Sequence, residues 1–526
     1  MILLSNINVS LDTDFNNLAP IAAKCLRVSD KDIISCSLYR KSIDARKKDN
    51  VHFCISLLAE VRGNEEKIIK KGKDAQIFNP VKYVWEKAQK IPEHPPVVVG
   101  FGPAGMFAAL ALARAGLKPI VIERGESVEQ RTKSIKEFFA GGKLNENSNI
   151  QFGEGGAGTF SDGKLNTGIK DPRCRAVLEA FVSFGAPKDI LIDAKPHIGT
   201  DILCDIVKNI REEILKLGGS IFFSSILTDI DKNTKTATIK NGAGEFKIEF
   251  SSLVLAIGHS ARDTFERLFN MGVPMEQKPF SVGVRIEHKQ ADINKALYGK
   301  FANHPALKAA DYKLAVHLEN GRGVYTFCMC PGGEVVNASS EKDGIVTNGM
   351  SNSARSGENA NSALLVGVEP SDLPDNGVLS GVYFQREIEK RAYNISGGAV
   401  PTQYVGDFLG NGVEDKKILP TVKPHTKQAR VEDVLPSFVA QSLKEGIIAL
   451  DKKLQGFSDS GALLTFPETR SSSPVRILRG ENYASLFAQW LYPCGEGAGY
   501  AGGIMSAAVD GLRCAEAVVA KENNGF

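Results

Sequence analysis

Residues 97–105 read Val97-Val-Val-Gly-Phe-Gly-Pro-Ala-Gly105, and this stretch decides the fold. Three consecutive Val residues predict a buried strand, and the glycines that follow predict a tight turn. Met106–Ala115 is rich in Ala and predicts a helix that ends at Gly116. A second strand is expected at Pro119–Glu123. A strand, a turn, a helix and a second strand in this order are typical of a parallel α/β sheet.

Three glycines of this turn and one carboxylate match what a dinucleotide needs. Gly100 permits the tight turn, Gly102 lets backbone N–H groups approach a pyrophosphate, and Gly105 lets the helix touch the strand. The unsatisfied N–H groups and the positive dipole at the helix start favour an anion. Glu123 ends the next strand, where it could accept hydrogen bonds from a ribose. These matches favour a Rossmann-type dinucleotide site over a Gly-rich turn that binds nothing.

Composition places the chain among ordinary globular proteins. It has 526 residues, 43% hydrophobic and 24% charged, so two or three domains are expected. A net charge of +3 provides no strong field for nucleic acid or a membrane surface. We find no secretory signal and no apolar run long enough to span a bilayer. The nine Cys lack metal-ligand spacing, so we expect no metal, reduced thiols and a cytoplasmic location.

Two later segments favour FAD over NAD. Leu253–Gly258 is an apolar strand ending in Gly, where a parallel sheet would meet the ligand. Leu491–Gly503 is a strand with an acidic Gly turn, and it precedes a helix of small residues at Ile504–Ala517. Glu496 could hydrogen-bond a ribityl chain. The N–H groups of residues 502–504 would face the N1–C2=O edge of a flavin, where a helix start stabilises negative charge on the reduced ring.

Several motifs resemble those of known flavoproteins. The turn at 100–105, the strand ending at Gly258 and the C-terminal Gly motif resemble segments of glutathione-reductase-type flavoproteins. More narrowly, the chain resembles a bacterial family of uncharacterised FAD-dependent dehydrogenases, also called NAD(FAD)-utilising dehydrogenases. The motifs that carry this closer match are Gly155–Leu165, Ala256–Asp263, Phe327–Gly333 and Glu468–Arg476. In the second motif Ile257 replaces the commoner Thr, which removes a hydroxyl but leaves the Gly.

The resemblance and the motifs together predict the residues that bind FAD. The resemblance implies that the Gly-rich segment 153–168 runs along the flavin with N–H groups near the ring. The alternative for this segment is a disordered surface loop. The predicted cofactor-binding residues are Gly100, Gly102, Pro103, Ala104, Gly105, Glu123, Arg124, Gly156, Ala157, Gly158, Ser161, Gly163, Lys164, Gly258, Gly495, Glu496, Gly502, Gly503 and Ile504.

The candidates for catalysis are fewer and each has a structural alternative. Cys328 and Cys330 could be redox-active or bind a soft metal, and strand alternation would place both on one face. Buried or pocket-lining thiols are the simpler interpretation, as packing is for Cys494. His259 could contact the cofactor or act as an acid–base, or be a hydrogen-bonded structural residue.

Basic and polar side chains near the C-terminal motif could bind a substrate. A fork of Arg470, Arg476 and Arg479 could clamp a carboxylate or phosphate, and salt bridges that fix a loop are the alternative. A Gly/Ser/Asn-rich segment between residues 331 and 361 could also line a pocket. Its candidate residues are Asn337, Asn348, Ser351, Asn352 and Arg355.

These observations predict an α/β fold with a Rossmann-type FAD-binding domain of the glutathione-reductase or p-hydroxybenzoate-hydroxylase kind. We expect a small N-terminal α+β domain at 1–90 and a Pro-rich link, then the first part of the FAD-binding domain at 91–280. An inserted α+β substrate or cap domain is expected at 281–479, and the FAD-binding domain resumes at 480–526. A second GxGxxG in a strand–turn–helix frame is not evident.

The predicted activity is that of an FAD-dependent oxidoreductase, a dehydrogenase or reductase whose electrons pass through flavin N5. NAD(P)H is a candidate transient donor, and a small-molecule substrate or electron carrier is the expected partner. Neither a nucleic acid nor a membrane is expected to bind. The alternatives are a tRNA-modifying flavoprotein, with the basic run 40–49 as its RNA contact, and a non-catalytic flavin-binding regulatory protein.

Overall fold

A five-stranded parallel sheet forms the core of the part predicted to bind FAD, called the FAD-binding part below, in the computed structural model, which describes residues 1–72, 74–80, 82–413 and 417–524. Its strand order is β23-β11-β5-β6-β7, and each neighbouring pair is parallel. The strands are β5 (Val97–Val99), β6 (Ile120–Ile122), β7 (Ser220–Phe222), β11 (Leu253–Leu255) and β23 (Leu491–Pro493). The predicted Rossmann-type sheet is therefore confirmed, and its edge strand β23 comes from the far end of the chain.

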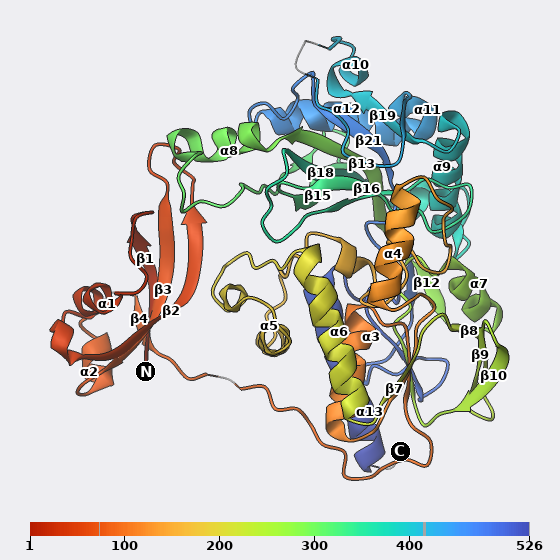
Figure 1. Cartoon of the computed structure of the whole chain (residues 1–526), viewed down its shortest axis with the longest axis horizontal. Coiled ribbons are helices and arrows are strands. Elements are labelled where there is room, and N and C mark those ends of the chain that lie inside the picture. The colour runs from red at the N-terminus through yellow and green to blue at the C-terminus, as the bar shows by residue number, and fades with distance from the viewer. Residues whose placement is uncertain (73, 81, 414–416, 525–526) are drawn as a thin grey trace.

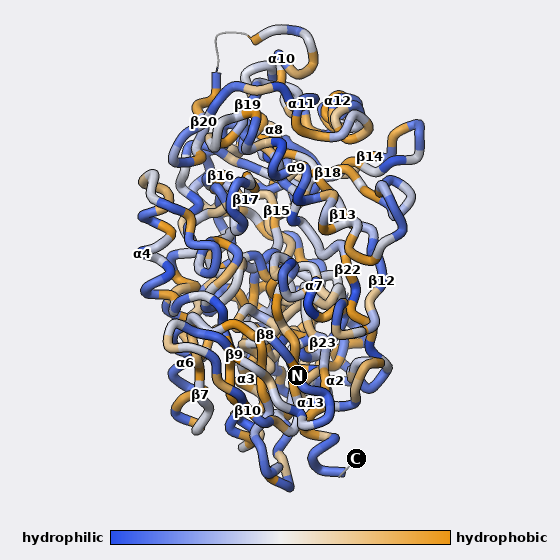
Figure 2. The backbone as a smooth tube through the Cα atoms, turned by 90° about the vertical axis from the view of Figure 1, so that its right-hand side faces the viewer, coloured by the Kyte–Doolittle hydropathy of each residue, from blue (hydrophilic) through white to orange (hydrophobic). Residues whose placement is uncertain are grey.

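Successive residues of each strand point to opposite faces of this sheet, and a layer of the protein packs on each face. Val98 packs into a core with α3 (Pro103–Ala115), α6 (Thr200–Lys216) and α13 (Ile504–Asn524). Val97 and Val99 pack on the other face against a three-stranded antiparallel sheet. Figure 1 shows α3, α6 and α13 side by side, and Figure 2 shows hydrophobic segments gathered in the interior around α3.

The helices α3 and α13 cross closely because small residues meet at the crossing. A Cβ on Gly511 would overlap the carbonyl oxygen of Ala104. The predicted Ala-rich helix packed against the sheet is thus confirmed, with eleven of its residues buried. Helix α6 has Gly199 as its N-cap, and Asp201 in its first turn accepts hydrogen bonds from Ser353.

A second, larger sheet lies above the FAD-binding part and is called the cap sheet below (Figure 1). Its strand order is β14-β15-β18-β13-β21-β19-β20. These strands are β13 (Phe280–Lys289), β14 (Ala315–His317), β15 (Gly323–Cys330), β18 (Asn359–Val368), β19 (Val400–Tyr404), β20 (Thr426–Gln428) and β21 (Leu463–Glu468). The helices that belong to it are α8 (Gln290–Tyr298), α9 (Ser380–Ser396), α10 (Val405–Leu409), α11 (Val431–Val434) and α12 (Ser437–Asp451). Leu435 and Pro436 separate α11 from α12.

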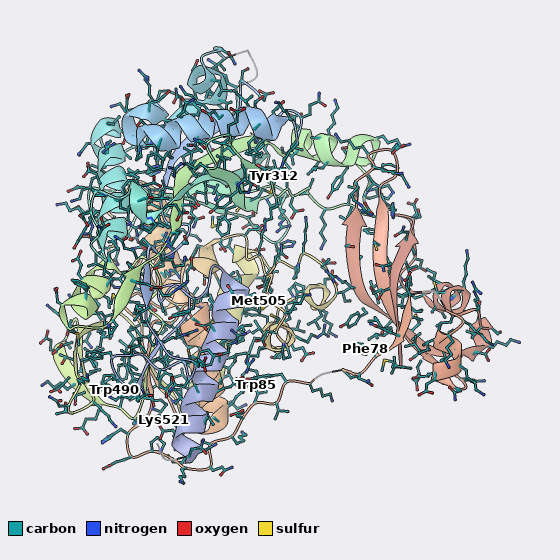
Figure 3. The ribbon with its side chains drawn as sticks, turned by 180° about the vertical axis from the view of Figure 1, so that it is seen from behind. Phe78, Trp85, Tyr312, Trp490, Met505 and Lys521 are labelled. Atoms are coloured by element: carbon teal, nitrogen blue, oxygen red, sulfur yellow. The ribbon has the colours of Figure 1, made fainter. Side chains whose placement is uncertain are left out.

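The N-terminal part is a four-stranded sheet of order β2-β3-β1-β4 that stands beside the other two (Figure 1). Its elements are β1 (Ile2–Val9), α1 (Ala19–Leu26), β2 (Ile33–Asp44), β3 (His52–Val61), α2 (Glu65–Ile69) and β4 (Ala75–Ile77). The edge strand β2 contacts the FAD-binding part, where the N–H of Lys41 donates to the carbonyl of Ile192 at 2.9 Å. The following link lies near α13, and Trp85 is labelled beside that helix in Figure 3. The limits at 90, 280 and 479 remain predictions.

The remaining elements are short and mostly flank the parallel sheet. They are α4 (Val128–Phe139), α5 (Arg173–Ser183), β8 (Ile226–Asp231), β9 (Thr236–Asn241), β10 (Gly244–Glu249), α7 (Arg262–Asn270), β12 (Met275–Gln277), β16 (Glu334–Asn337), β17 (Thr347–Met350) and β22 (Val475–Ile477). Among the described residues, no helix combines the length and the apolar character needed to cross a bilayer.

Candidate functional site

A cavity of about 440 Å³ lies between the carboxyl ends of the parallel strands and the cap sheet. Its volume is in the range of small-molecule and cofactor sites, roughly 300–1,000 Å³. The turn after β5, the end of β6, the segment 151–158 and the start of α13 line its lower part. Tyr312, Thr326–Met329 and Glu468 line it from the cap side. In Figure 3, Tyr312 lies at the cap sheet and Met505 at the upper end of α13, on either side of this region.

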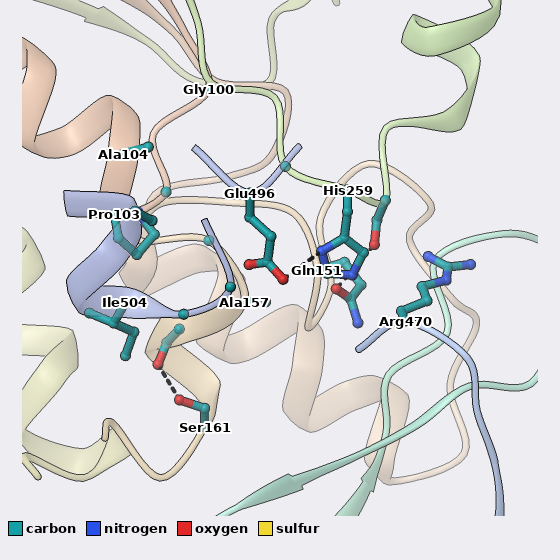
Figure 4. A pocket seen from close by; sticks show the side chains of 18 of the residues that line it. Gly100, Pro103, Ala104, Gln151, Ala157, Ser161, His259, Arg470, Glu496 and Ile504 are labelled. Atoms are coloured by element: carbon teal, nitrogen blue, oxygen red, sulfur yellow. Dashed lines mark hydrogen bonds and ion pairs between the residues drawn. The ribbon is translucent and has the colours of Figure 1, made fainter. Parts of the chain in front are cut away.

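Two helix N-termini meet at this cavity. Helix α3 begins at Pro103 with Gly102 as N-cap, and α13 begins at Ile504. The residues 102–104 and 502–504 both line the cavity, and Figure 4 shows Pro103 close to Ile504. Because the first N–H groups of a helix have no intrahelical acceptor, both ends favour a negatively charged ligand. The two helix starts that the sequence predicts therefore lie at one cavity.

The glycines at 100 and 105 shape the turn by letting backbones touch. Gly100 has φ +95°, and a Cβ there would overlap the carbonyl oxygen of Ala256, the residue that follows β11. A Cβ on Gly105 would overlap the carbonyl oxygen of Gly100. Gly105 does not line the cavity, so its role is to bring α3 against the strand rather than to touch a ligand.

Glu123 anchors the glycine turn after β5 to the neighbouring loops. Its carboxylate is nearly buried and accepts hydrogen bonds from the N–H groups of Phe101 at 2.7 Å, Gly125 at 2.8 Å and Gly153 at 3.0 Å. It also lines the cavity, where Oε2, which accepts only one of these three bonds, keeps acceptor capacity. The predicted contact with a ribose stays a prediction, and the three bonds show why a carboxylate is needed here.

Arg124 lines the cavity beside Glu123 but is already engaged. Its guanidinium pairs with Asp263 at 2.7 Å and lies 4.4 Å from the ring centre of Phe152. It forms part of the cavity wall. Its role as a cofactor-binding residue stays a prediction.

The Gly-rich segment 153–168 is ordered, so the disordered-loop alternative is wrong. Arg131 is fully buried, and its guanidinium donates to the carbonyls of Glu154 at 2.7 Å and Gly156 at 3.0 Å. Ser161 Oγ donates to the Gly158 carbonyl at 2.7 Å, as Figure 4 shows. Of the residues predicted here, Gly156, Ala157, Gly158, Ser161 and Lys164 line the cavity.

Gly163 and Gly495 do not line the cavity, and their role as cofactor-binding residues stays a prediction. A Cβ on Gly163 would lie 2.9 Å from the N atom of Gly199, so this glycine allows the loop to pack on the start of α6. The N–H of Gly495 donates to Asp510 at 2.7 Å. Both glycines position neighbours that do line the cavity.

The side chains of His259 and Glu496 lie next to each other at the cavity wall. His259 Nδ1 lies 3.3 Å from Glu496 Oε1, and both side chains line the cavity (Figure 4). The imidazole is about 91% buried, with 9% of the side chain exposed, and its Nε2 has no hydrogen-bond partner among the described residues. The preceding Gly258 has φ +71° and also lines the cavity. A buried nitrogen without a partner suits a site completed by a polar ligand.

The cavity fits an extended anionic dinucleotide on these observations. Its donors are backbone N–H groups at two helix starts, its acceptors are the Glu123 and Glu496 carboxylates, and glycines leave room where the backbone approaches the ligand. The residues that would hold FAD are those of the turn 100–104, Glu123, the segment 156–164, Gly258 and residues 502–504.

The predicted arginine fork is not formed. Arg470 pairs with Glu389 at 2.8 Å, and Arg479 pairs with Asp510 at 2.7 Å. Arg476 pairs with a half-exposed glutamate on β12 at 3.2 Å. Only Arg470 of the three lines the cavity. Opposite charges from three different elements separate the guanidinium groups, which adjacency in sequence could not reveal.

Arg470 belongs to a buried ion network that joins the two sheets. Glu389 on α9 is 1% exposed and binds Arg470 at 2.8 Å and Arg262, at the start of α7, at 2.7 Å. Burial raises the pKa of Glu389, but the two guanidinium groups outweigh it and hold this pKa well below its usual range. Glu341 adds a second carboxylate 2.8 Å from Arg262. The network therefore fixes the cap over the FAD-binding part.

Glu468 is a cavity-lining carboxyl group that the sequence did not single out. It ends β21, a fully buried strand, and lies 3.4 Å from Arg285, whose side chain is also fully buried. Burial raises the pKa of Glu468 to about 7, and Arg285 offsets part of that rise. The one signal in the sequence is a carboxylate at the end of an otherwise apolar strand.

The polar segment 331–361 contributes one residue to the cavity. Asn348 lines it, whereas Ser351 and Arg355 both bind the buried Asp162. Asn337 accepts a hydrogen bond from the Ser339 hydroxyl at 2.6 Å. The expectation that the segment lines a pocket is correct for Asn348 alone among the residues named.

The alternation predicted for Cys328 and Cys330 is wrong, because a β-bulge interrupts β15 between Phe327 and Cys330. Cys328 takes a left-handed conformation with φ +42° and lines the cavity. Cys330 is buried, and its thiol donates to the Cys328 carbonyl at 3.3 Å.

Among the described residues, one group of three side chains has metal-ligand spacing. Cys494, Asp510 and Cys514 have ligand atoms within 4.8 Å of one another. The Arg479 guanidinium pairs with Asp510 and lies 3.5 Å from the Cys514 sulfur. A cation is therefore already present where a metal would bind, and we assign none.

The raised pKa of Glu468 predicts a stability effect that depends on pH. The folded state keeps a proton on Glu468 up to about pH 7, whereas an unfolded Glu loses it near 4.5. Protonated Glu468 therefore stabilises the folded state below pH 4.5. This contribution to the free energy of unfolding is lost as pH rises to about 7. We therefore expect the Tm of Glu468→Gln, relative to wild type, to increase between pH 5 and pH 8 in thermal melts. A constant or falling difference would contradict a protonated, buried carboxyl group.

Comparisons with known proteins identify three regions of the chain. Residues 95–295 match the family model described as pyridine nucleotide-disulphide oxidoreductase, and residues 279–471 match one described as FAD-dependent protein, C-terminal domain-like. Residues 1–60 match a domain of unknown function. A protein of Clostridium beijerinckii described as uncharacterized is 47% identical over 529 residues, which is 98% of each chain.

Three solved structures that align with most of this chain do so at low sequence identity and with TM-scores below 0.5. A triple mutant of a flavin-dependent brominase aligns with a TM-score of 0.39 and 14% identity, covering 82% of this chain and 81% of that one. A flavoprotein/dehydrogenase from Cytophaga hutchinsonii aligns with a TM-score of 0.37 and 13% identity, covering 82% and 79%. Aklavinone-11 hydroxylase in a complex with FAD and aklavinone aligns with a TM-score of 0.33 and 13% identity, covering 82% and 63%.

The matched regions coincide with the architecture of the site. The pyridine nucleotide-disulphide oxidoreductase match covers the glycine turn and β11, and the FAD-dependent C-terminal match covers most of the cap sheet. FAD is the cofactor, and the protein is an FAD-dependent oxidoreductase. None of these matches supports RNA modification or a purely regulatory role. The chain belongs to the family of FAD-dependent proteins, uncharacterised in their substrate, that includes the Clostridium beijerinckii relative.

Proposed function

We propose that the protein is a dehydrogenase or reductase that passes electrons through flavin N5 between a soluble donor and a small-molecule substrate or electron carrier. The observation that supports this proposal is one continuous cavity with two chemically different sides. Helix starts and glycines form the lower side, and side chains of the cap sheet form the upper side. A cofactor on the first side and a substrate on the second would share the space between them.

On the lower side, the chain's own residues bind and orient the cofactor. The start of α3 would hold the pyrophosphate, and Glu123 would hold a ribose while it keeps the turn in place. The start of α13 would stabilise negative charge at the flavin edge. Bound FAD supplies the hydride and electron transfer itself.

On the upper side, Glu468 is the residue best placed to hold or move a proton. It lines the cavity, it is nearly buried, and its pKa of about 7 lets it exchange a proton at neutral pH. Tyr312, Lys313 and Asn348 line the same side and would contact a polar substrate. NAD(P)H would bind transiently, because the described residues contain one dinucleotide-type parallel sheet.

The experiment that tests the proposal is an anaerobic titration of the FAD-loaded protein with NADH and with NADPH. We expect one of them to bleach the flavin absorbance, and added electron acceptors to restore it. Bound flavin that stays oxidised with both donors, yet is reduced by dithionite, would contradict an NAD(P)H-linked dehydrogenase or reductase. Such a result would favour a non-catalytic flavin-binding protein.

Glu468→Gln is expected to slow turnover by roughly 10²-fold, the lower end of what a general acid–base contributes. The wild-type rate should show an apparent pKa near 7, which the variant should lack. The measurement is the pH profile of flavin reoxidation by the acceptor found in the titration. Asp263→Asn, which alters an ion pair with Arg124 on another wall of the cavity, should keep the profile. An unchanged profile in Glu468→Gln would exclude this carboxyl group from proton transfer.

A further inference from the structure

Two thiols lie side by side at the cap end of the cavity. Phe327, Cys328 and Met329 line the cavity at the end of β15, and Cys330 follows as a buried residue. The β-bulge and the left-handed conformation of Cys328 break the regular strand at this point. A left-handed backbone is uncommon for a residue with a Cβ, and such residues gather at functional sites. The local distortion brings the thiol of Cys330 to the backbone and side chain of Cys328.

Two cations border this pair of thiols. Arg285 is fully buried and donates to the Cys328 carbonyl at 3.0 Å and to the Cys330 sulfur at 3.7 Å. Lys164, from the Gly-rich segment, donates to the Met329 carbonyl between the two cysteines. The nearby carboxyl groups are Asp162, which raises the pKa of both thiols, and Glu468. Arg285 and Lys164 each affect the pKa of Cys328 more than Asp162 does, so the charges around this sulfur favour a thiolate.

The protonation states of the two thiols differ. A hydrogen bond from Cys330 is the main factor that lowers the pKa of Cys328 to about 6, and Arg285 and Lys164 lower it further against the effect of burial. The same hydrogen bond and burial raise the pKa of Cys330 well above its usual range. At neutral pH this gives a thiolate on Cys328 that lines the cavity, with a protonated partner next to it.

We propose that Cys328 and Cys330 form a redox-active dithiol that exchanges two electrons with the flavin cofactor across the cavity. The proposal rests on the proposed function, because it needs FAD in the lower part of the cavity. The pair lies outside residues 95–295, the part that matches the pyridine nucleotide-disulphide oxidoreductase model. It would therefore be a thiol centre contributed by the cap sheet rather than by the dinucleotide-binding part.

The exchange balances without a further reactant. Oxidation forms a bond between the two sulfur atoms, breaks the S–H bond of Cys330 and releases two electrons and one proton. Oxidised FAD is the acceptor of this hydride equivalent, and the reverse step reduces the disulfide. A packing role alone does not account for a buried guanidinium group 3.7 Å from the Cys330 sulfur, since buried structural thiols sit in apolar surroundings. A metal is also disfavoured, because among the described residues no third ligand groups with these two.

The first test measures the thiols by mass. The purified full-length chain, without added FAD, is equilibrated in glutathione buffers of increasing oxidising strength, trapped with an alkylating reagent and digested. We expect the peptide with Cys328 and Cys330 to change from two alkyl groups to an internal disulfide, while Cys494 and Cys514 stay alkylated. A peptide that keeps both alkyl groups in the most oxidising buffer would overturn the proposal. Oxidation at Cys494 and Cys514 instead would also overturn it.

The second test counts electrons in the FAD-loaded chain. Anaerobic dithionite titration of the oxidised wild type should take about four electrons per bound flavin, two for each two-electron couple. Cys328→Ser and Cys330→Ser should each take about two. Cys174→Ser, which changes a half-buried thiol on α5 outside the cavity, should take the wild-type number. Two electrons in the wild type would overturn the proposal. A chain that takes up no FAD would instead defeat the proposed function, and the mass measurement would still report on the thiols.

Discussion

Gly105→Ala is expected to abolish retention of FAD by the purified protein. The new Cβ would overlap the carbonyl oxygen of Gly100, which belongs to the backbone and has no freedom to rotate away. Helix α3 would have to move off the strand, and its first N–H groups would leave the position from which they face the ligand. We expect the affinity for FAD to fall by more than about 10³-fold, which corresponds to roughly 4 kcal/mol.

The measurement is FAD uptake by the apoprotein, followed by flavin fluorescence or calorimetry. Gly242→Ala is the matched control, since it adds the same methyl group to an exposed hairpin turn where nothing lies within 4 Å and φ is not positive. The control should bind FAD as the wild type does. Circular dichroism separates loss of the site from loss of the fold. Near wild-type affinity in a folded Gly105→Ala protein would refute the close contact between α3 and the turn.

Glu389→Gln is expected to destabilise the protein by about 3–5 kcal/mol, as removal of one partner from a buried ion pair does. The side chains of Arg262 and Arg470 are 1% and 2% exposed, and both would lose their fully buried carboxylate partner. Glu341 would remain near the two guanidinium groups, but it is also shared with Arg386. The lost free energy would appear as a lower midpoint in urea unfolding, with the slope unchanged.

An exposed ion pair provides the control for this change. Glu179 pairs with Arg175 one turn apart on α5, and the two side chains are 57% and 45% exposed. Glu179→Gln should change stability by less than about 0.5 kcal/mol. A similarly small effect for Glu389→Gln would mean that the network does not hold the cap sheet in place. Arg470, which would lose its partner, lines the cavity. We therefore also expect folded Glu389→Gln protein to bind FAD less tightly than the wild type.

The FAD side of the cavity was predictable from sequence because its chemistry is local. A strand, a glycine turn and a helix start are contiguous residues, and each glycine has a short-range geometric reason to be there. The turn at 100–105 and the helix start at 504 could therefore be placed before any tertiary contact was known. Gly163 and Gly495 show the limit of this reasoning. Gly163 packs against the backbone of Gly199, and Gly495 donates a hydrogen bond to Asp510, so neither lines the cavity.

The cap side was much less predictable because its contacts are long-range. Glu468 on β21 and Arg285 on β13 are 183 residues apart in sequence, yet their side chains lie 3.4 Å apart. The arginines at 470, 476 and 479 looked like a cluster, yet each finds its carboxylate on a different element. The bulge that distorts β15 arises from its pairing with β18, which strand alternation within one segment does not reveal.

The edge strand β23 and helix α13 have a consequence for how the protein matures. Both come from residues 491–524, and they complete one side of the parallel sheet and one wall of the cavity. During translation, the glycine turn leaves the ribosome hundreds of residues earlier, and it must wait for this last segment. Stable capture of FAD therefore requires residues 491–524, and a nascent chain that stalls before β23 is synthesised would lack this wall of the cavity.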